Sequence, residues 1–157
     1  MIRLKNLLGL ALLMTEMCQA QPVRQGKIVF SQLTAGGRSA ILSANTDGSS
    51  SRVLLIQESK TLLDPSWAPG GGIYYVSADP NGQFSDLCWM SAEGKNSRVV
   101  RSFAGSVVFQ PTPSPNGRYL LFYAAETNGG HERAQMWIAA ADGSNARPFG
   151  PPDVAFP

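Results

Sequence analysis

The chain has 157 residues, of which 43% are hydrophobic and 15% are charged, and its formal net charge is +2. This composition is typical of a folded domain and argues against intrinsic disorder. The charge is too small to indicate binding to nucleic acid or to an anionic membrane surface. We therefore expect no nucleic-acid partner.

The N-terminal segment has the pattern of a secretory signal peptide. Arg3 and Lys5 precede an apolar run at 7–14, and Cys18 and Ala20 provide small residues at the two cleavage positions. The run is too short to span a bilayer, which needs about 20 apolar residues, so a membrane anchor fits less well. We predict cleavage after Ala20 and a periplasmic or secreted protein.

Cys18 raises the alternative of a lipoprotein with lipid attached to its thiol. A lipobox has a small residue before the cysteine, whereas bulky Met17 stands there in this chain. Removal of the signal peptide, residues 1–20, leaves a domain at 21–157 with Cys88 as its single cysteine. The exported domain is therefore expected to have no internal disulfide, and packing must hold it together.

A unit returns roughly every 46 residues along the chain. One landmark is a short turn with an acid and a glycine, in which we expect the acid to accept backbone N–H groups. The other landmark is a turn with proline and glycine before an apolar segment. The first landmark occupies Thr46–Ser49, Ala92–Lys95 and Ala141–Ser144, and the second occupies Trp67–Gly71 and Pro113–Gly117. A fixed period of this length indicates a repeat architecture.

Each unit contains short segments rich in β-branched and aromatic residues, separated by Gly, Asn, Asp and Pro. In the middle unit these segments lie at 62–67, 73–77, 85–90 and 97–102. Four antiparallel strands in a unit of this size form one blade of a β-propeller. We predict an all-β fold, a partial β-propeller of about three four-stranded antiparallel blades. The repeats run over about 26–70, 71–117 and 118–157.

The order of turns and strands resembles the TolB-type repeat, also called a WD-like β-propeller repeat. The residues that carry the resemblance are Trp67-Ala68-Pro69, the segment 114–118 and the segment 141–147. The resemblance extends over nearly all of 26–157 and implies blades, while it implies no particular activity. TolB proteins have six blades and a separate α/β domain before them, which this chain does not show.

The number of strands leaves the ring incomplete. The first unit begins at its second strand, 27–30, and Asp153–Pro157 stands where the first strand of a further blade would begin. Propellers commonly close with four to eight blades. Either the chain is a truncated or open arc of three blades, or two copies join head-to-tail as a homodimer. In that six-bladed ring the terminal strand of each copy would complete the first blade of the other.

No catalytic, cofactor or metal constellation accompanies the repeat. His131 is the only histidine and falls in a Gly-rich hairpin tip, so the usual histidine-rich metal site is not available. A Gly-x-Ser-x-Gly nucleophile motif is also missing from the sequence. We therefore expect no metal, no cofactor and no enzymatic activity.

Three tryptophans, Trp67, Trp89 and Trp137, fall in strands of different units. They pack between blades, or they form an aromatic platform for a sugar or peptide, in which case Trp89 and Trp137 are the candidate ligand-binding residues. Several arginines fall on fourth strands, where charge discourages pairing between sheet edges. They are Arg52, Arg98, Arg101 and Arg147.

These observations favour a noncatalytic exported module that mediates protein–protein interaction, with envelope association, through blade loops such as 78–84 and 125–133. A carbohydrate-binding propeller is the first alternative, because of the tryptophans. The second alternative is the detached propeller part of a prolyl-oligopeptidase-like hydrolase whose catalytic domain is encoded elsewhere.

Overall fold

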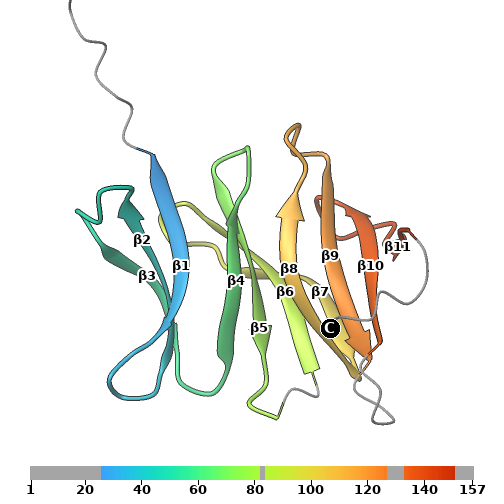
Figure 1. Cartoon of the computed structure of the whole chain (residues 1–157), viewed down its shortest axis with the longest axis horizontal. Helices are drawn as coiled ribbons and strands as arrows, with labels where there is room; N and C mark the ends of the chain where they lie inside the picture. The colour runs from blue at the N-terminus through green and yellow to red at the C-terminus, as the bar shows by residue number, and fades with distance from the viewer. Residues whose placement is uncertain (1–25, 82–83, 127–132, 151–157) are drawn as a thin grey trace, which may run out of the picture.

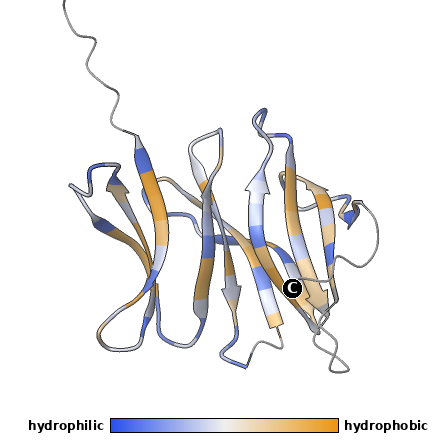
Figure 2. Cartoon of the chain, viewed as in Figure 1, coloured by the Kyte–Doolittle hydropathy of each residue, from blue (hydrophilic) through white to orange (hydrophobic). Residues whose placement is uncertain are grey.

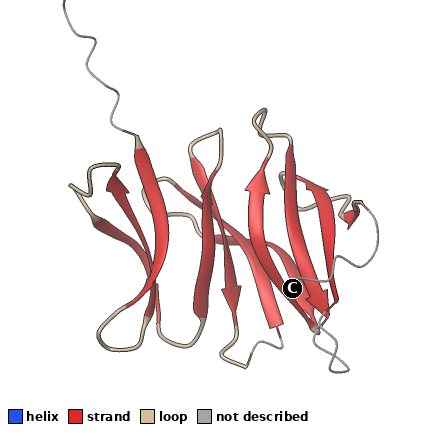
Figure 3. Cartoon of the chain, viewed as in Figure 1, coloured by secondary structure: helices blue, strands red, loops and turns tan. Residues whose placement is uncertain are grey.

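The computed structural model describes residues 26–81, 84–126 and 133–150. Within these ranges the chain forms eleven strands and no helix (Figure 3). The strands are β1 Lys27–Leu33, β2 Ser39–Asn45, β3 Arg52–Gln57, β4 Thr61–Trp67, β5 Gly72–Ala78, β6 Phe84–Ser91, β7 Arg98–Ala104, β8 Ser106–Pro113, β9 Tyr119–Glu126, β10 Arg133–Ala140 and β11 Arg147–Pro148. The all-β prediction is confirmed.

The strands form three antiparallel sheets that stand side by side (Figure 1). Their strand orders are β1-β2-β3, β4-β5-β6-β7 and β8-β9-β10-β11, so each sheet is a meander of neighbouring strands. We call them blades 1, 2 and 3. Strand β1 packs beside β4 as β5 packs beside β8, so β1 corresponds to a second strand. The first described strand thus has the place of a second strand, as the segment 27–30 predicted.

The sheets are offset from the sequence repeats by one strand. Strand β4 lies within the repeat 26–70, but it pairs with β5 of the next repeat. Strand β8 likewise lies within 71–117 and pairs with β9. Each complete blade therefore takes its innermost strand from the end of the preceding repeat. As a result, one sequence repeat contributes strands to two neighbouring blades.

Burial on both faces explains why the strands are apolar throughout and do not alternate. Every residue of β5 is buried, because blade 2 stands between the other two blades. Continuous apolar stretches accordingly run along strands such as β9 (Figure 2). A sheet covered on two sides needs such continuous apolar runs, as the sequence of the middle unit predicted.

Two apolar cores fill the spaces between blades. The core between blades 1 and 2 contains Ile41, Leu62, Ile73, Tyr75, Cys88 and Met90. The core between blades 2 and 3 contains Tyr74, Val76, Leu87, Val108, Leu120, Phe122, Ala124 and Ala139. Burial of apolar area at about 25 cal/mol per Å² makes these cores the main stabilising contribution.

A buried serine repeats the same contact at both blade interfaces. The N–H of Leu62 donates to Ser39 Oγ at 2.8 Å, and the N–H of Val108 donates to Ser85 Oγ at 2.8 Å. Ser85 also donates to the carbonyl of Ser106 at 3.2 Å. Each serine therefore fixes the innermost strand of the following blade to the third strand of its own blade.

The recurring acid–glycine turn has two structural roles. Its acids accept backbone hydrogen bonds as predicted, since the N–H groups of Ser49 and Ser144 donate to Asp47 and Asp142 at 2.9 Å. Gly94 adopts φ = 80°, a conformation that side chains disfavour. A Cβ at Gly94 would also collide with the backbone of β3, so this turn sits directly against the preceding blade.

Several expectations fall outside the described residues. These are the signal peptide at 1–20, the hairpin tip that contains His131, and the terminal segment Asp153–Pro157. The described part of the chain contains no helix long and apolar enough to cross a membrane.

Candidate functional site

The two tryptophans predicted as ligand-binding candidates meet in one core. Trp89 on β6 and Trp137 on β10 both pack, partly buried, against the apolar core between blades 2 and 3. Trp89 also lies beneath the guanidinium of Arg98, whose Cζ is 5.2 Å from the ring centroid. Their contacts are those of packing residues, and Trp89 in addition borders a hollow.

This hollow lies at what we call the turn end of the arc, the upper end in Figure 1. The turn end carries the turns at 45–49, 67–72, 91–95, 113–118 and 140–144. The hollow between blades 2 and 3 measures about 140 Å³, and we call it the Trp89 hollow. Its walls are Ala68, Pro69, Gly70, Gly72, Tyr74, Trp89, Pro113 and Gly117.

Glycine and a tyrosine hydroxyl shape the Trp89 hollow. A Cβ at Gly72 would collide with the indole nitrogen of Trp89, so glycine is needed to seat that ring. Tyr74 donates its hydroxyl to the carbonyl of Ala141 at 2.7 Å, and burial raises the pKa of Tyr74. The tyrosine therefore stays neutral and holds the third blade's turn, while its ring forms an apolar wall.

A larger hollow of about 360 Å³ lies at the turn end between blades 1 and 2, and we call it the Trp67 hollow. Its walls are Lys27, Arg52, Trp67, Ala92 and Glu93. Arg52 donates through Nη2 to the carbonyl of Ala92 at 3.1 Å, so it bridges the two blades. A hydrogen bond from the side chain of Ser91 lowers the pKa of Glu93, which is anionic at neutral pH.

Trp67 forms an aromatic wall of this hollow. Its indole Nε1 is buried from solvent and has no hydrogen-bond partner among the described residues. Buried donors are nearly always paired, and an unpaired one costs about 1–3 kcal/mol. A ligand that entered the hollow would meet two cations, Lys27 and Arg52, and the carboxylate of Glu93.

The sequence placed the arginines correctly and did not reveal what they contact. Arg52, Arg98, Arg101 and Arg147 lie on β3, β7 and β11, the outermost strands, as predicted. Arg52 and Arg101 also reach the turn of the following blade, the latter with Nη1 3.4 Å from the carbonyl of Gly143. The spacing between each arginine and the next acid–glycine turn was the available signal.

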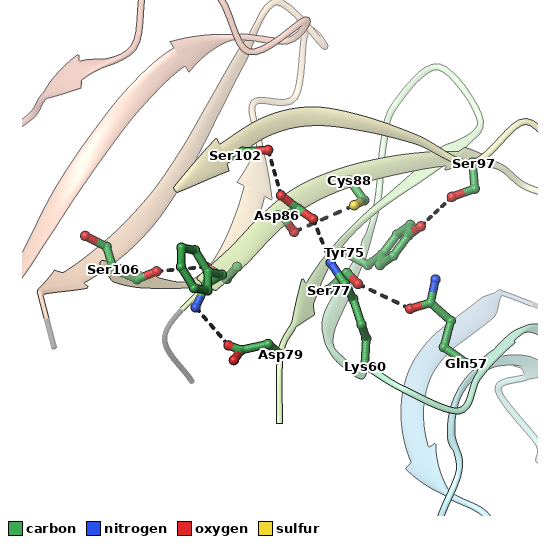
Figure 4. Close-up of polar contacts among 12 residues, drawn as sticks. Gln57, Lys60, Tyr75, Ser77, Asp79, Asp86, Cys88, Ser97, Ser102 and Ser106 are labelled. Carbon is green, nitrogen blue, oxygen red and sulfur yellow. Dashed lines mark hydrogen bonds and ion pairs between the residues drawn. The ribbon is translucent and has the colours of Figure 1, made fainter. Parts of the chain in front are cut away.

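A polar cluster occupies the blade 1–blade 2 interface away from the turn end (Figure 4). Asp86 accepts from Lys60 Nζ at 3.0 Å and from Ser102 Oγ at 2.7 Å. Burial alone would raise the pKa of Asp86, but these hydrogen bonds and the charge of Lys60 outweigh it and lower that pKa. The arrangement joins the β3–β4 loop to blade 2 as an ion pair.

Neither Tyr75 nor Cys88, next to this cluster, is activated. Burial raises the pKa of Tyr75 to about 12 and that of Cys88 to about 11. The Tyr75 hydroxyl lies 2.6 Å from Ser97 Oγ, which fixes it in the core. A thiol with such a pKa is protonated at neutral pH and is a poor nucleophile.

The described residues also contain no group of three or more His, Cys, Asp or Glu side chains placed to hold a metal ion. The hollows of these ranges include the Trp67 and Trp89 hollows, which both lie at the turn end and at a blade interface. Of the predicted interaction loops 78–84 and 125–133, the described residues 78–81, 84, 125–126 and 133 lie at the opposite end, and the others fall outside the described residues.

No family model matches the chain, and no curated protein matches it. Among solved structures it is similar to TolB from Acinetobacter baumannii, with a TM-score of 0.64 and 22% identity over 80% of this chain. The fold is a partial TolB-like β-propeller. The chain spans 30% of that TolB structure.

Two other propellers are similar at lower identity. One is an oligogalacturonate lyase in complex with manganese, with a TM-score of 0.52 and 17% identity over 71% of this chain and 30% of the lyase. The other is the β-propeller domain of the Trilobed protease from Pyrococcus furiosus, described as having an open velcro topology. Its TM-score is 0.53 at 16% identity over 80% of this chain and 39% of the domain. Identities this low show the fold alone.

Proposed function

We propose that the protein is a noncatalytic propeller module that is exported to the periplasm or secreted and binds a protein partner at the turn end. The observation that carries this proposal is the Trp67 hollow, which combines the aromatic wall of Trp67 with charges of both signs from Lys27, Arg52 and Glu93. The hollow's volume of about 360 Å³ is within the range that accommodates a ligand group.

The chemistry of the Trp67 hollow suits a segment of polypeptide. A backbone carbonyl or a carboxylate of the partner would accept hydrogen bonds from Lys27 or Arg52, whose positive charges favour an acceptor there. Glu93 would accept from N–H groups or cations of the same segment. A polypeptide offers both kinds of group within a few ångströms, whereas a simple anion satisfies only the cations.

Binding is tested with the protein as bait for envelope extract, followed by calorimetry with each purified partner. Lys27→Ala removes one exposed cation from the hollow, so we expect affinity to fall about tenfold, which corresponds to one charge-assisted hydrogen bond of about 1.4 kcal/mol. Arg38→Ala is the matched control, since Arg38 is an exposed cation in the β1–β2 loop at the other end. Equal affinity for wild type and Lys27→Ala would exclude this hollow.

Export is supported by the signal-peptide pattern of residues 1–20. We expect the protein in the periplasmic or secreted fraction, with Gln21 as its first residue after cleavage. Envelope association follows if the partner is an envelope protein. N-terminal sequencing of the exported protein tests this, and an intact Met1 on the exported chain would contradict it.

Carbohydrate binding is a second candidate, favoured by the Trp89 hollow. Trp89 and Tyr74 provide two aromatic walls there, and aromatic faces are common sugar-binding surfaces. Acidic sugars would also suit Lys27 and Arg52 in the neighbouring hollow. A glycan array that includes oligogalacturonates tests this, with Trp89→Ala and Trp137→Ala as variants. Trp89 borders the hollow, so its loss should abolish a genuine signal.

A third candidate is the detached propeller of a prolyl-oligopeptidase-like hydrolase. The similarity to the propeller domain of the Trilobed protease supports it at the level of fold. It requires a catalytic domain from a separate chain. A hydrolase reading frame beside the gene, and co-purification of its product, would distinguish this candidate from the interaction module.

A further inference from the structure

Blades 1 and 3 each have one face that no other described blade covers, and we call these two surfaces the open faces. Both open faces carry apolar residues at the strand positions that form the internal blade interfaces. On blade 1, Val29 and Ile41 contact the core shared with blade 2. Side chains alternate across a strand, so their neighbours in β1 and β2 point to the opposite, open face. These residues are Ile28, Phe30, Leu42 and Ala44, joined by the cross-strand pairs 28–44 and 30–42.

Blade 3 has a corresponding open face. Leu120 and Phe122 belong to the core shared with blade 2, so the alternate residues of β9 and β10 point away from it. These are Leu121, Tyr123, Met136 and Ile138, joined by the pairs 121–138 and 123–136. The four side chains are all partly exposed. Charged groups, which normally cover a solvent-facing sheet, are missing from these positions.

The two open faces correspond to the two opposite sides of a blade interface. Leu121 and Tyr123 hold the places in β9 that Tyr74 and Val76 hold in β5, where they pack against the following blade. Ile28 and Phe30 hold the places in β1 that Ile73 and Tyr75 hold in β5, where they pack against the preceding blade. One end of the arc therefore offers an outgoing face, and the other end offers an incoming face.

We propose that the occupant of each open face is a second copy of this chain, docked head-to-tail so that two copies close a six-bladed ring. The number of copies follows from the three blades that the described residues form. Propellers close with about four to eight blades, so two such arcs fall within this range and three arcs exceed it. Two arcs give a closed ring with twofold symmetry and leave neither face exposed.

The acid–glycine turn provides a specific contact for this ring. Gly94 and Gly143 sit against the outer strands of the preceding blades, at Leu54 and Val100, whereas a Cβ at Gly48 would meet nothing within 4 Å. Phe149, which is 44% exposed, follows Arg147 as Leu54 follows Arg52. In the ring, the Gly48 turn of one copy takes its place against the Phe149 region of its partner.

The first experiment measures the mass of the processed wild-type protein by light scattering and native mass spectrometry. We expect twice the chain mass, with dissociation on dilution. Ile28→Glu and Met136→Glu each place a charge at one open face and should each raise the dissociation constant at least about 100-fold. Val99→Glu is the control, because Val99 is 53% exposed and lies on the outermost strand of blade 2.

The outcomes separate the proposal from other assemblies. A wild type that stays monomeric into the high-micromolar range overturns it, as does open polymerisation. A dimer that only one of the two glutamate variants disrupts is head-to-head, which also overturns it. Loss of the dimer in both variants, with Val99→Glu still dimeric and all circular dichroism spectra unchanged, supports it.

A second pair of variants tests the position of the turn with minimal change. Gly48 and Gly71 have φ of 81° and 85°, and neither would crowd a neighbour if a Cβ were added. Both alanine substitutions therefore carry the same backbone strain in the isolated arc. The ring predicts that Gly48→Ala raises the dissociation constant of the dimer at least about tenfold. Gly71→Ala should leave this dissociation constant unchanged. Equal dissociation constants would overturn the proposed register.

Discussion

Replacement of Gly94 by alanine should expose how closely neighbouring blades approach each other. Gly94 lies in the β6–β7 turn with φ = 80°, and a Cβ there would collide with the carbonyl oxygen of Leu54 in β3. That oxygen belongs to the backbone of a paired strand, so it cannot rotate away as a side chain would. Either the turn or the whole of β3 must shift.

The cost has two parts that a matched variant separates. Alanine in the left-handed region costs about 1–2 kcal/mol, and forcing extra volume into a packed contact costs about 1–3 kcal/mol more. Gly71→Ala should show only the first part, because Gly71 has φ = 85° and open space around it. We therefore expect Gly94→Ala to lose about 2–5 kcal/mol in total, a large share of the usual 5–15 kcal/mol.

Urea unfolding followed by circular dichroism measures both variants against wild type. The midpoint should fall further for Gly94→Ala than for Gly71→Ala, with a similar slope if unfolding stays two-state. Equal midpoints for the two variants would mean that the turn and β3 are not in contact. The reasoning about the recurring glycine would then fail, and the arrangement of blades 1 and 2 with it.

Three further outcomes follow from the buried polar groups. Ser85→Ala should destabilise the fold by about 1–3 kcal/mol, because it leaves the buried N–H of Val108 unpaired; a change below 0.5 kcal/mol in urea unfolding would contradict this. Asp86, whose pKa is lowered, stabilises the fold above its unfolded pKa near 3.8 and loses this contribution as the pH falls through its folded pKa. Asp86→Asn should therefore lower the free energy of unfolding by about 1 kcal/mol at neutral pH and by progressively less below pH 3.8. A difference between wild type and variant that stays constant across acid denaturation would refute the stabilising role of the Asp86 carboxylate. In a Cys18→Ser background, Cys88 should react with a disulfide reagent at least about 100-fold faster in the urea-unfolded protein than in the folded protein. The reason is that a pKa of about 11 suppresses the thiolate in the folded protein. Equal rates in the two states would contradict the burial of Cys88.

Much of the fold could be predicted because a repeat constrains it several times over. The segments 73–77 and 85–90 were expected as strands and lie within β5 and β6. The turns that bound them carry Gly and Pro at positions where few other residues fit. Because these local signals recur in three units, the sequence predicted both the strand order and the place of β1 as a second strand.

The contacts between blades could not be predicted in the same way. Ser39 and Ser85 each bond to a residue 23 positions later, half a repeat away, and nothing local distinguishes them from exposed strand serines. The unpaired N–H of Trp67 depends on which atoms fail to approach it, which no pattern of residue types encodes. The candidate site therefore emerged only when the blades were placed side by side.

Blade 3 departs from its neighbours at one position that bears on how the proposed ring would come apart. Ala134 occupies the place in β10 that Ser39 and Ser85 occupy in β2 and β6, so the outgoing side of blade 3 lacks the serine contact. Each such serine makes two hydrogen bonds to the next innermost strand. At about 1 kcal/mol for each bond, the seam between copies would be weaker than an internal interface by about 2 kcal/mol. Dilution or mild denaturant should therefore separate the ring into intact three-bladed arcs before any blade unfolds, because the seam is the interface with the fewest polar restraints.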